Sequence, residues 1–465
     1  MGSISKARRR WRWASLIAML AATAASAQQP PTGTQTEKPQ APETAPARPQ
    51  ATPLPAVAQI GPAREIKLAE YTWFRFGAQV QLWFKAAQDR IRQTDGSDGG
   101  YALDFYCRRC RFFSTGSIVK DVYFNVLFEA ANVGRADPTT GARTTPVPSI
   151  LDAYGQVKFA DAFWLSGGQI LLPLTRNGLQ PTTTYVSVDT ANVATTAALQ
   201  ANTNTLRDLG VQANGFFADN HVEYRLGVYQ GTRQPGTGAQ TAGHNGPRVV
   251  AMVSANLWDP ETGYVNGGHY YGTRKVIGVM GNFDYQALRK SEPATVPFPA
   301  TLGAGADKNA YVGLSGAAFI NYPLAGPNPR GGDEIVGLLQ FGYYDGGLRG
   351  ILTAPTNLGS YPLILKQTNY LAEAGYYNHG GHFSVFGKFE MRKISEDYPL
   401  AFRQALPAAV SPTQTWLAAG VKYYVAPANF LNFTLQYERV NNNDAPGGEQ
   451  RGTNNITFQM QTILY

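Results

Sequence analysis

Two cysteines, Cys107 and Cys110, form a C-x-x-C pattern, which in other proteins marks a redox or metal-binding site. In an extended strand, residues three apart point to opposite faces and lie about 10 Å apart, whereas a disulfide needs Cα atoms within about 7 Å. A bond would therefore require a bulge or turn at Arg108-Arg109. Export to an oxidising compartment favours the bond if the geometry allows it. Bonded and free cysteines both remain open, while no second Cys or His pair has the spacing for a metal site.

His379 and His382 resemble a pair of metal ligands, but the two glycines between them are typical of a tight turn. The chain has five histidines, and none lies close to a serine in a recognisable nucleophile motif. We therefore expect no catalytic residues, no metal, no cofactor and no enzymatic activity.

Basic side chains occupy polar positions of segments in which polar and apolar residues alternate, and on the strands of a barrel these positions face the lumen. The pore-lining candidates, one of them in a long connection, are Arg75, Lys158, Arg176, Arg207, Arg225, Lys388, Arg392 and Lys422. The acidic residues that share this face are Glu129, Glu223, Glu373, Glu390 and Glu438. Rings of one sign select ions, whereas mixed rings mostly hold the wall in shape. Structural pairing is therefore favoured over a selectivity role for each basic residue.

Strands must position these side chains, and the clearest strand lies near the end of the chain. Leu431, Phe433, Leu435 and Tyr437 alternate with polar residues, which puts the two sets on opposite faces. Sixteen candidate strands of this kind cover 73–84, 103–114, 119–131, 150–159, 163–173, 206–217, 221–231, 247–257, 274–286, 309–320, 334–345, 367–377, 382–393, 414–425, 429–439 and 454–464. We predict an all-β fold, a transmembrane antiparallel β-barrel of about 16 strands.

The connections between these strands alternate in length. Long ones such as 85–102 are followed by short ones such as 115–118, and the exceptions are 258–273 and 321–333, which should be short and are not. Long external loops on one rim and short periplasmic turns on the other are typical of outer-membrane barrels.

Residues 1–27 are typical of a cleaved signal peptide, with five basic residues, an apolar run at 16–25 and a small-x-small site at 25–27. An uncleaved anchor is the alternative, but this run is short for about 30 Å of hydrocarbon. Residues 28–70 are rich in proline and predict a disordered periplasmic spacer, with partner binding as the alternative. Residues 71–465 form the barrel domain, in which no run of about 18 apolar residues occurs.

The formal charge of the chain is +8, of which +5 belongs to residues 1–27, so about +3 remains. This excess is too small to indicate a nucleic-acid partner, which would need a clustered basic surface.

The connection at 174–205 carries Arg176 and Asp189 and shows no strong alternation. A barrel of this size leaves an aqueous channel that a loop can narrow. We expect this connection to fold into the channel and constrict it, with an ordinary surface loop as the alternative.

Five segments occur in the order and spacing of a known family: 105–111, which is rich in arginine, 151–154, 168–176, 207–212 and 222–231. They resemble the phosphate-selective porins O and P. The resemblance covers about residues 73–290 well and the rest by architecture. It implies a sixteen-stranded, homotrimeric outer-membrane channel, and it does not by itself identify phosphate as the solute.

These features predict an outer-membrane porin, surrounded by outer-membrane lipid, that forms a water-filled diffusion channel for small hydrophilic solutes. A general channel and one that prefers anions or phosphate both stay open. Two alternatives stay open: a structural barrel that tethers an envelope partner through the spacer, and a barrel enzyme.

Deletion of about residues 184–200 should raise the single-channel conductance in a planar bilayer, because it removes the expected constriction. An unchanged conductance would contradict the constriction.

Overall fold

The computed structural model describes residues 65–137, 140–195, 206–231, 246–287, 310–346, 366–397, 413–425, 430–444 and 449–464. The expected signal peptide at 1–27 and residues 28–64 of the expected spacer lie outside this part of the chain. At the end of the spacer range, the short strand β1 (Glu65–Lys67) pairs antiparallel with the start of the next strand.

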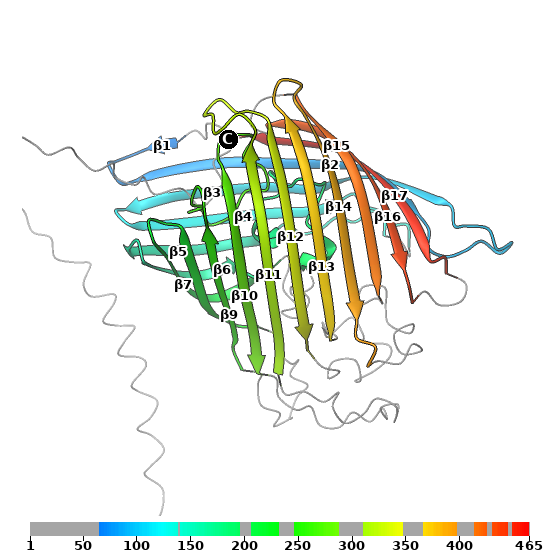
Figure 1. Cartoon of the computed structure of the whole chain (residues 1–465), viewed down its shortest axis with the longest axis horizontal. Coiled ribbons are helices and arrows are strands. Elements are labelled where there is room, and N and C mark those ends of the chain that lie inside the picture. The colour runs from blue at the N-terminus through cyan, green and yellow to red at the C-terminus, as the bar shows by residue number, and fades with distance from the viewer. Residues whose placement is uncertain are drawn as a thin grey trace, which may run out of the picture. The chain divides into compact units, whose positions relative to one another are not determined.

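The described strands form one antiparallel sheet that closes on itself (Figure 1). Its strands are β2 (Trp73–Gln88), β3 (Tyr101–Val119), β4 (Val122–Val133), β5 (Ser149–Ala160), β6 (Phe163–Leu171), β7 (Arg207–Phe217), β8 (Val222–Tyr229), β9 (Arg248–Asn256), β10 (Val276–Ala287), β11 (Ala310–Pro323), β12 (Glu334–Asp345), β13 (Gln367–Asn378), β14 (Phe383–Ile394), β15 (Gln414–Tyr424), β16 (Leu431–Asn442) and β17 (Gly452–Leu464).

Each of these strands pairs with its neighbour in chain order, and β17 pairs with β2 to complete the ring. The sheet has 17 strands, of which β1 is a three-residue addition to β2, so the barrel wall has 16. The predicted fold class and strand number are confirmed. Closure leaves no open sheet edge, so the wall satisfies its own backbone hydrogen bonds.

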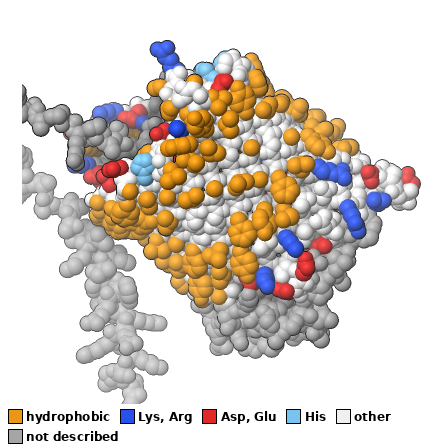
Figure 2. All heavy atoms as spheres, viewed as in Figure 1, with side chains coloured by type: hydrophobic (Ala, Val, Ile, Leu, Met, Phe, Trp, Pro, Cys, Tyr) orange, Lys and Arg blue, Asp and Glu red, His pale blue; other side chains and the backbone are white. Residues whose placement is uncertain are grey.

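Alternation along each strand makes the outer face apolar and the inner face polar. On β16, Leu435 and Tyr437 are exposed outside, whereas Asn432 and Thr434 are fully buried inside. Figure 2 shows hydrophobic side chains covering the outer face over the strands at the front of Figure 1, with charged side chains toward the margins. No helix among the described residues is long and apolar enough to cross a membrane.

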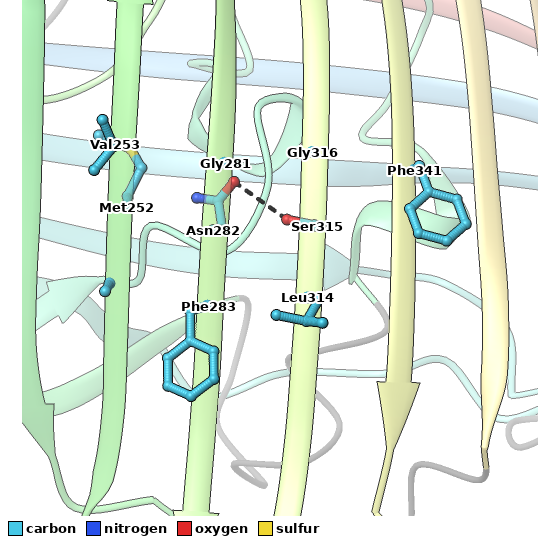
Figure 3. Close-up of a pocket in the computed structure, with 10 residues that line it drawn as sticks. Met252, Val253, Gly281, Asn282, Phe283, Leu314, Ser315, Gly316 and Phe341 are labelled. Atoms are coloured by element: carbon cyan, nitrogen blue, oxygen red, sulfur yellow. Dashed lines mark hydrogen bonds between the residues drawn. The ribbon is translucent and has the colours of Figure 1, made fainter.

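The wall at β9–β12 shows both faces at one level (Figure 3). Phe283, Leu314 and Phe341 line a shallow apolar hollow on the outer side. Asn282 and Ser315 are hydrogen-bonded to each other at 3.2 Å on the inner side. The wall therefore presents an apolar face outward and hydrogen-bonding groups inward.

The two rims of the barrel differ, as predicted. The turn rim carries short connections such as 120–121 and 161–162, and the loop rim carries long ones such as 134–148. The two exceptions noted in the sequence remain long on the turn rim, at 257–275 and 324–333.

Strand β3 contains a bulge at the C-x-x-C sequence. Leu82 lies opposite Cys107 and Gln81 lies opposite Arg109, so Arg108 is an extra residue. The Cα atoms of Cys107 and Cys110 lie 6.5 Å apart and a disulfide joins the two side chains. Of the two states that the sequence leaves open, the structure contains the bonded one, with the bulge that it requires.

Leu339→Arg should lower the free energy of unfolding from lipid vesicles by about 2–4 kcal/mol, because it puts a charge at mid-strand on the outer face of β12. Val425→Arg is the matched control, since Val425 is also exposed but lies just beyond the end of β15, where the cost falls to about 0–1 kcal/mol. Equal effects of the two variants would contradict an outer face that contacts lipid.

Candidate functional site in the barrel lumen

The connection after β6 folds back into the barrel. Residues 172–195, here the loop-rim segment, are mostly buried and include the short 3-10 helices η1 (Asn177–Leu179) and η2 (Asn192–Thr195). The expectation that the connection at 174–205 folds inward is confirmed for 174–195. The remainder, 196–205, lies outside the described residues.

Side chains of the wall hold the loop-rim segment in place. The backbone N–H of Ser187 donates to the carboxylate of Glu373 at 3.2 Å, and that of Val193 donates to Glu390 at 3.0 Å. Buried backbone N–H groups without partners are costly. These two inward glutamates therefore anchor the segment, which explains part of the mixed charge predicted for the lumen.

The connection between β9 and β10 enters the barrel from the opposite rim, and we call residues 257–275 the turn-rim segment. Arg176 of the loop-rim segment donates to both carboxylate oxygens of Glu261, each at 2.8 Å. The backbone N–H of Asn266 donates to the Leu179 carbonyl at 3.1 Å. The two segments thus meet inside the barrel.

An apolar core occupies the part of the lumen where the segments meet. Leu174, Leu179 and Val193 of the loop-rim segment are buried in it. The wall contributes inward apolar side chains, mostly of β8 to β13 and with others from β5, β6 and β15, among them Tyr154, Ile170, Tyr229, Val250, Met252, Met280, Phe319, Leu338, Leu371 and Trp416. This core fills one side of the lumen.

Within the described part of the chain, two larger cavities are bordered mainly by the other side of the wall. The first cavity has a volume of about 290 Å³ and is lined by residues of β2–β4, β14, β16, β17 and the loop-rim segment. The second has a volume of about 280 Å³ and is lined mostly by residues of β2–β5 and the loop-rim segment. Both are bordered by Arg108, Asp189, Thr190 and Asn192. These four residues therefore form the boundary between the two cavities.

Arginines of β3 dominate this boundary. Arg108 lies 3.0 Å from the carboxylate of Asp189, and Arg109 contacts the same carboxylate. Arg111 pairs with Glu129 at 2.7 Å on the wall behind them. Two guanidinium groups thus converge on one carboxylate of the loop-rim segment.

The contact with the two arginines keeps the Asp189 carboxylate ionised. Burial alone would raise the pKa of the Asp189 carboxyl group, but Arg108 and Arg109 lower that pKa well below its usual range. A depressed pKa means that the stabilising contribution is fully present above the unfolded value of about 3.9 and is lost only as the pH falls through the lower folded value. The contact therefore persists at neutral and mildly acidic pH.

Two of the eight predicted pore-lining residues border the cavities. Arg207 lines the second cavity and pairs with Asp152 at 3.1 Å. Lys388 lines the first cavity and pairs with Glu390 at 2.9 Å.

Arg176 and Arg225 face the interior but do not border either cavity. Arg225 pairs with Glu223 at 2.7 Å and donates to the Tyr264 carbonyl of the turn-rim segment at 2.8 Å. The turn-rim segment covers both arginines. Their separation from the cavities could not be predicted from the sequence, because the strand pattern does not show where this connection runs.

The other four predicted residues also have partners. Lys422 donates to the Tyr185 carbonyl of the loop-rim segment at 2.6 Å, and Arg392 donates to Gln414 at 2.7 Å. Near the turn rim, the remaining pairs are Arg75 with Glu65 at 2.8 Å and Lys158 with Asp161 at 2.6 Å.

Sequence reasoning missed other basic residues of the cavities. The residues that line them but were not among the pore-lining candidates are Lys85, Arg108, Arg109, Arg111 and Arg135. For the arginines of β3, the sequence feature that could have revealed their inward orientation is the bulge, because it changes which positions of the strand face the lumen. Before the bulge even positions face inward and after it odd positions do, so a single register for the whole strand misplaces them.

Comparisons with known proteins bear on the fold. No family model matches the sequence, and a search of curated proteins returned no match. Among solved structures, OprB of Pseudomonas putida is similar with a TM-score of 0.55 at 9% identity, covering 84% of this chain and 94% of that one. OmpF of Salmonella typhi in complex with daunomycin is similar with a TM-score of 0.52 at 12% identity, covering 86% of this chain and 100% of that one. The chain has the fold of the outer-membrane porins.

Glu261→Gln should lower the free energy of unfolding by about 3–5 kcal/mol, because it leaves the buried Arg176 without a counter-charge. Glu396→Gln is the matched control, because its partner Lys393 and the glutamate itself are both exposed, and its expected effect is about 0–1 kcal/mol. Denaturant unfolding measures both variants. Similar values would contradict a structural contact between the two segments.

Proposed function

We propose that the protein is an outer-membrane channel through which small hydrophilic solutes diffuse down their gradients. The observation that carries this proposal is the closed barrel with an apolar exterior and two cavities, each bordered by several charged side chains, beside a folded-in segment. An apolar exterior suits lipid, and a polar lumen suits water and dissolved solutes. The homotrimer implied by the family resemblance belongs to the same proposal, and chemical cross-linking in native membranes tests it.

We further propose a preference for anions, with phosphate as one candidate solute. The two cavities are lined by seven basic and three acidic side chains. The basic residues are Lys85, Arg108, Arg109, Arg111, Arg135, Arg207 and Lys388, and the acidic ones are Asp152, Asp189 and Glu438. A passage lined mostly by one sign of charge, with low-dielectric walls, raises the local concentration of counter-ions. This local excess of basic side chains supports an anion preference, although the net charge of the whole chain does not indicate one.

Lys85 and Arg135 are the best probes of this preference. Neither forms a salt bridge with any other residue that the structure describes, so their charges are available to passing ions. Their removal also leaves no buried carboxylate without its partner.

The double variant Lys85→Gln/Arg135→Gln should lower the anion-over-cation permeability ratio about two- to fivefold, because two cationic groups leave the lining. Reversal potentials in a KCl gradient across a planar bilayer measure this ratio, and repeating them with phosphate as the anion tests that solute. Arg143→Gln is the control, since Arg143 is exposed, pairs with Asp104 and borders neither cavity. A cation-preferring wild type would overturn the anion preference.

The same measurement distinguishes the proposed channel from the alternative of a structural barrel whose spacer binds an envelope partner. A diffusion channel produces ion-permeable steps in a planar bilayer, whereas a purely structural barrel produces none.

A further inference from the structure

The apolar residues of β3 change phase along the strand. Leu103 and Phe105, at odd positions, are 67% and 57% exposed on the outer face, while Phe112, at an even position, is 67% exposed on the same face. Such a change of phase requires one extra residue between the two sets. The apolar pattern therefore requires a bulge between Phe105 and Phe112 but does not determine which residue is the extra one.

The disulfide determines which residue of β3 is the extra one. Cys107 lies opposite Leu82 and Cys110 lies opposite Val80, and paired residues of neighbouring strands project from the same face of the sheet. Both cysteines are therefore on the outer face. The bond spans only 108–109, so it confines the extra residue to these two positions.

The consequence inside the barrel is that two adjacent arginines face the lumen. In a regular strand one of two neighbours points outward. Here Arg108 is the last inward residue before the phase change and Arg109 is the first after it. Both guanidinium groups reach Asp189, at the boundary between the two cavities.

We propose that the Cys107–Cys110 disulfide is a positioning element for the selectivity of the channel. It sets the bulge at Arg108, and so presents two guanidinium groups to the boundary between the two cavities. Without the bond the extra residue shifts along β3, one arginine leaves the lumen, and Asp189 loses a partner. This inference rests on the proposed channel function.

A general stabilising role is the competing explanation. A disulfide restrains the unfolded chain less when the loop that it closes is short, and this loop contains only the two residues between the cysteines. Local geometry is therefore the main effect expected of this bond.

The test compares wild type with Cys107→Ala/Cys110→Ala by reversal potentials and single-channel recording in planar bilayers. We expect the anion-over-cation permeability ratio of the variant to fall about twofold, because one cationic group leaves the boundary. Wild type reduced with a phosphine before reconstitution, with its free thiols verified by mass spectrometry, should show the same fall. The double variant should not respond to the phosphine.

Val80→Ala/Leu82→Ala is the matched control, since it removes side chains from the same outer face, opposite the cysteines. It should lower stability without changing the permeability ratio. An unchanged ratio in the cysteine variant and in the reduced wild type would overturn the positioning role, as would an equal change in the control variant. Absence of ion-permeable steps in the wild type would instead overturn the channel function.

Discussion

Every backbone N–H and C=O group that is shielded from water needs a partner, and this requirement organises the whole molecule. In the wall, the requirement is met by the ladder that β17 completes by pairing with β2. The loop-rim segment lies inside the ring without a strand beside it, so side chains must provide the hydrogen-bond partners of its backbone. Glu373 and Glu390 accept from its N–H groups and Lys422 donates to one of its carbonyls.

This use of charge changes how the lumen is interpreted. Arg176, Glu261 and Arg225 are interior charges, yet they join the two inward segments to each other and to the wall. The charges that face the cavities are a different set, concentrated on β2–β4 around Arg108 and Arg109. A count of inward residues therefore overestimates how many charges a passing solute would encounter.

The strands could be predicted closely because burial on one face imposes a period of two, as at Leu431–Tyr437, and all sixteen predicted segments coincide with strands of the wall. The inward fold of 174–195 was also predictable, from its length and lack of alternation. The path of 257–275 was not, because only its excess length was visible, and its contacts with Arg176 and Leu179 are tertiary. The arginines of β3 were absent from the pore-lining candidates, because a single bulged residue changes which residues beyond it face the lumen.

Because the two segments meet inside the barrel, the diameter of the ring does not determine how much open space the lumen contains. The number of strands determines the circumference of a barrel. Here an apolar mass occupies one side of that circle, and the two cavities lie off-centre, along the wall at β2–β5 and at β14, β16 and β17. In the proposed channel, the size limit for solutes should therefore follow the volume of the internal filling and not the diameter of the ring.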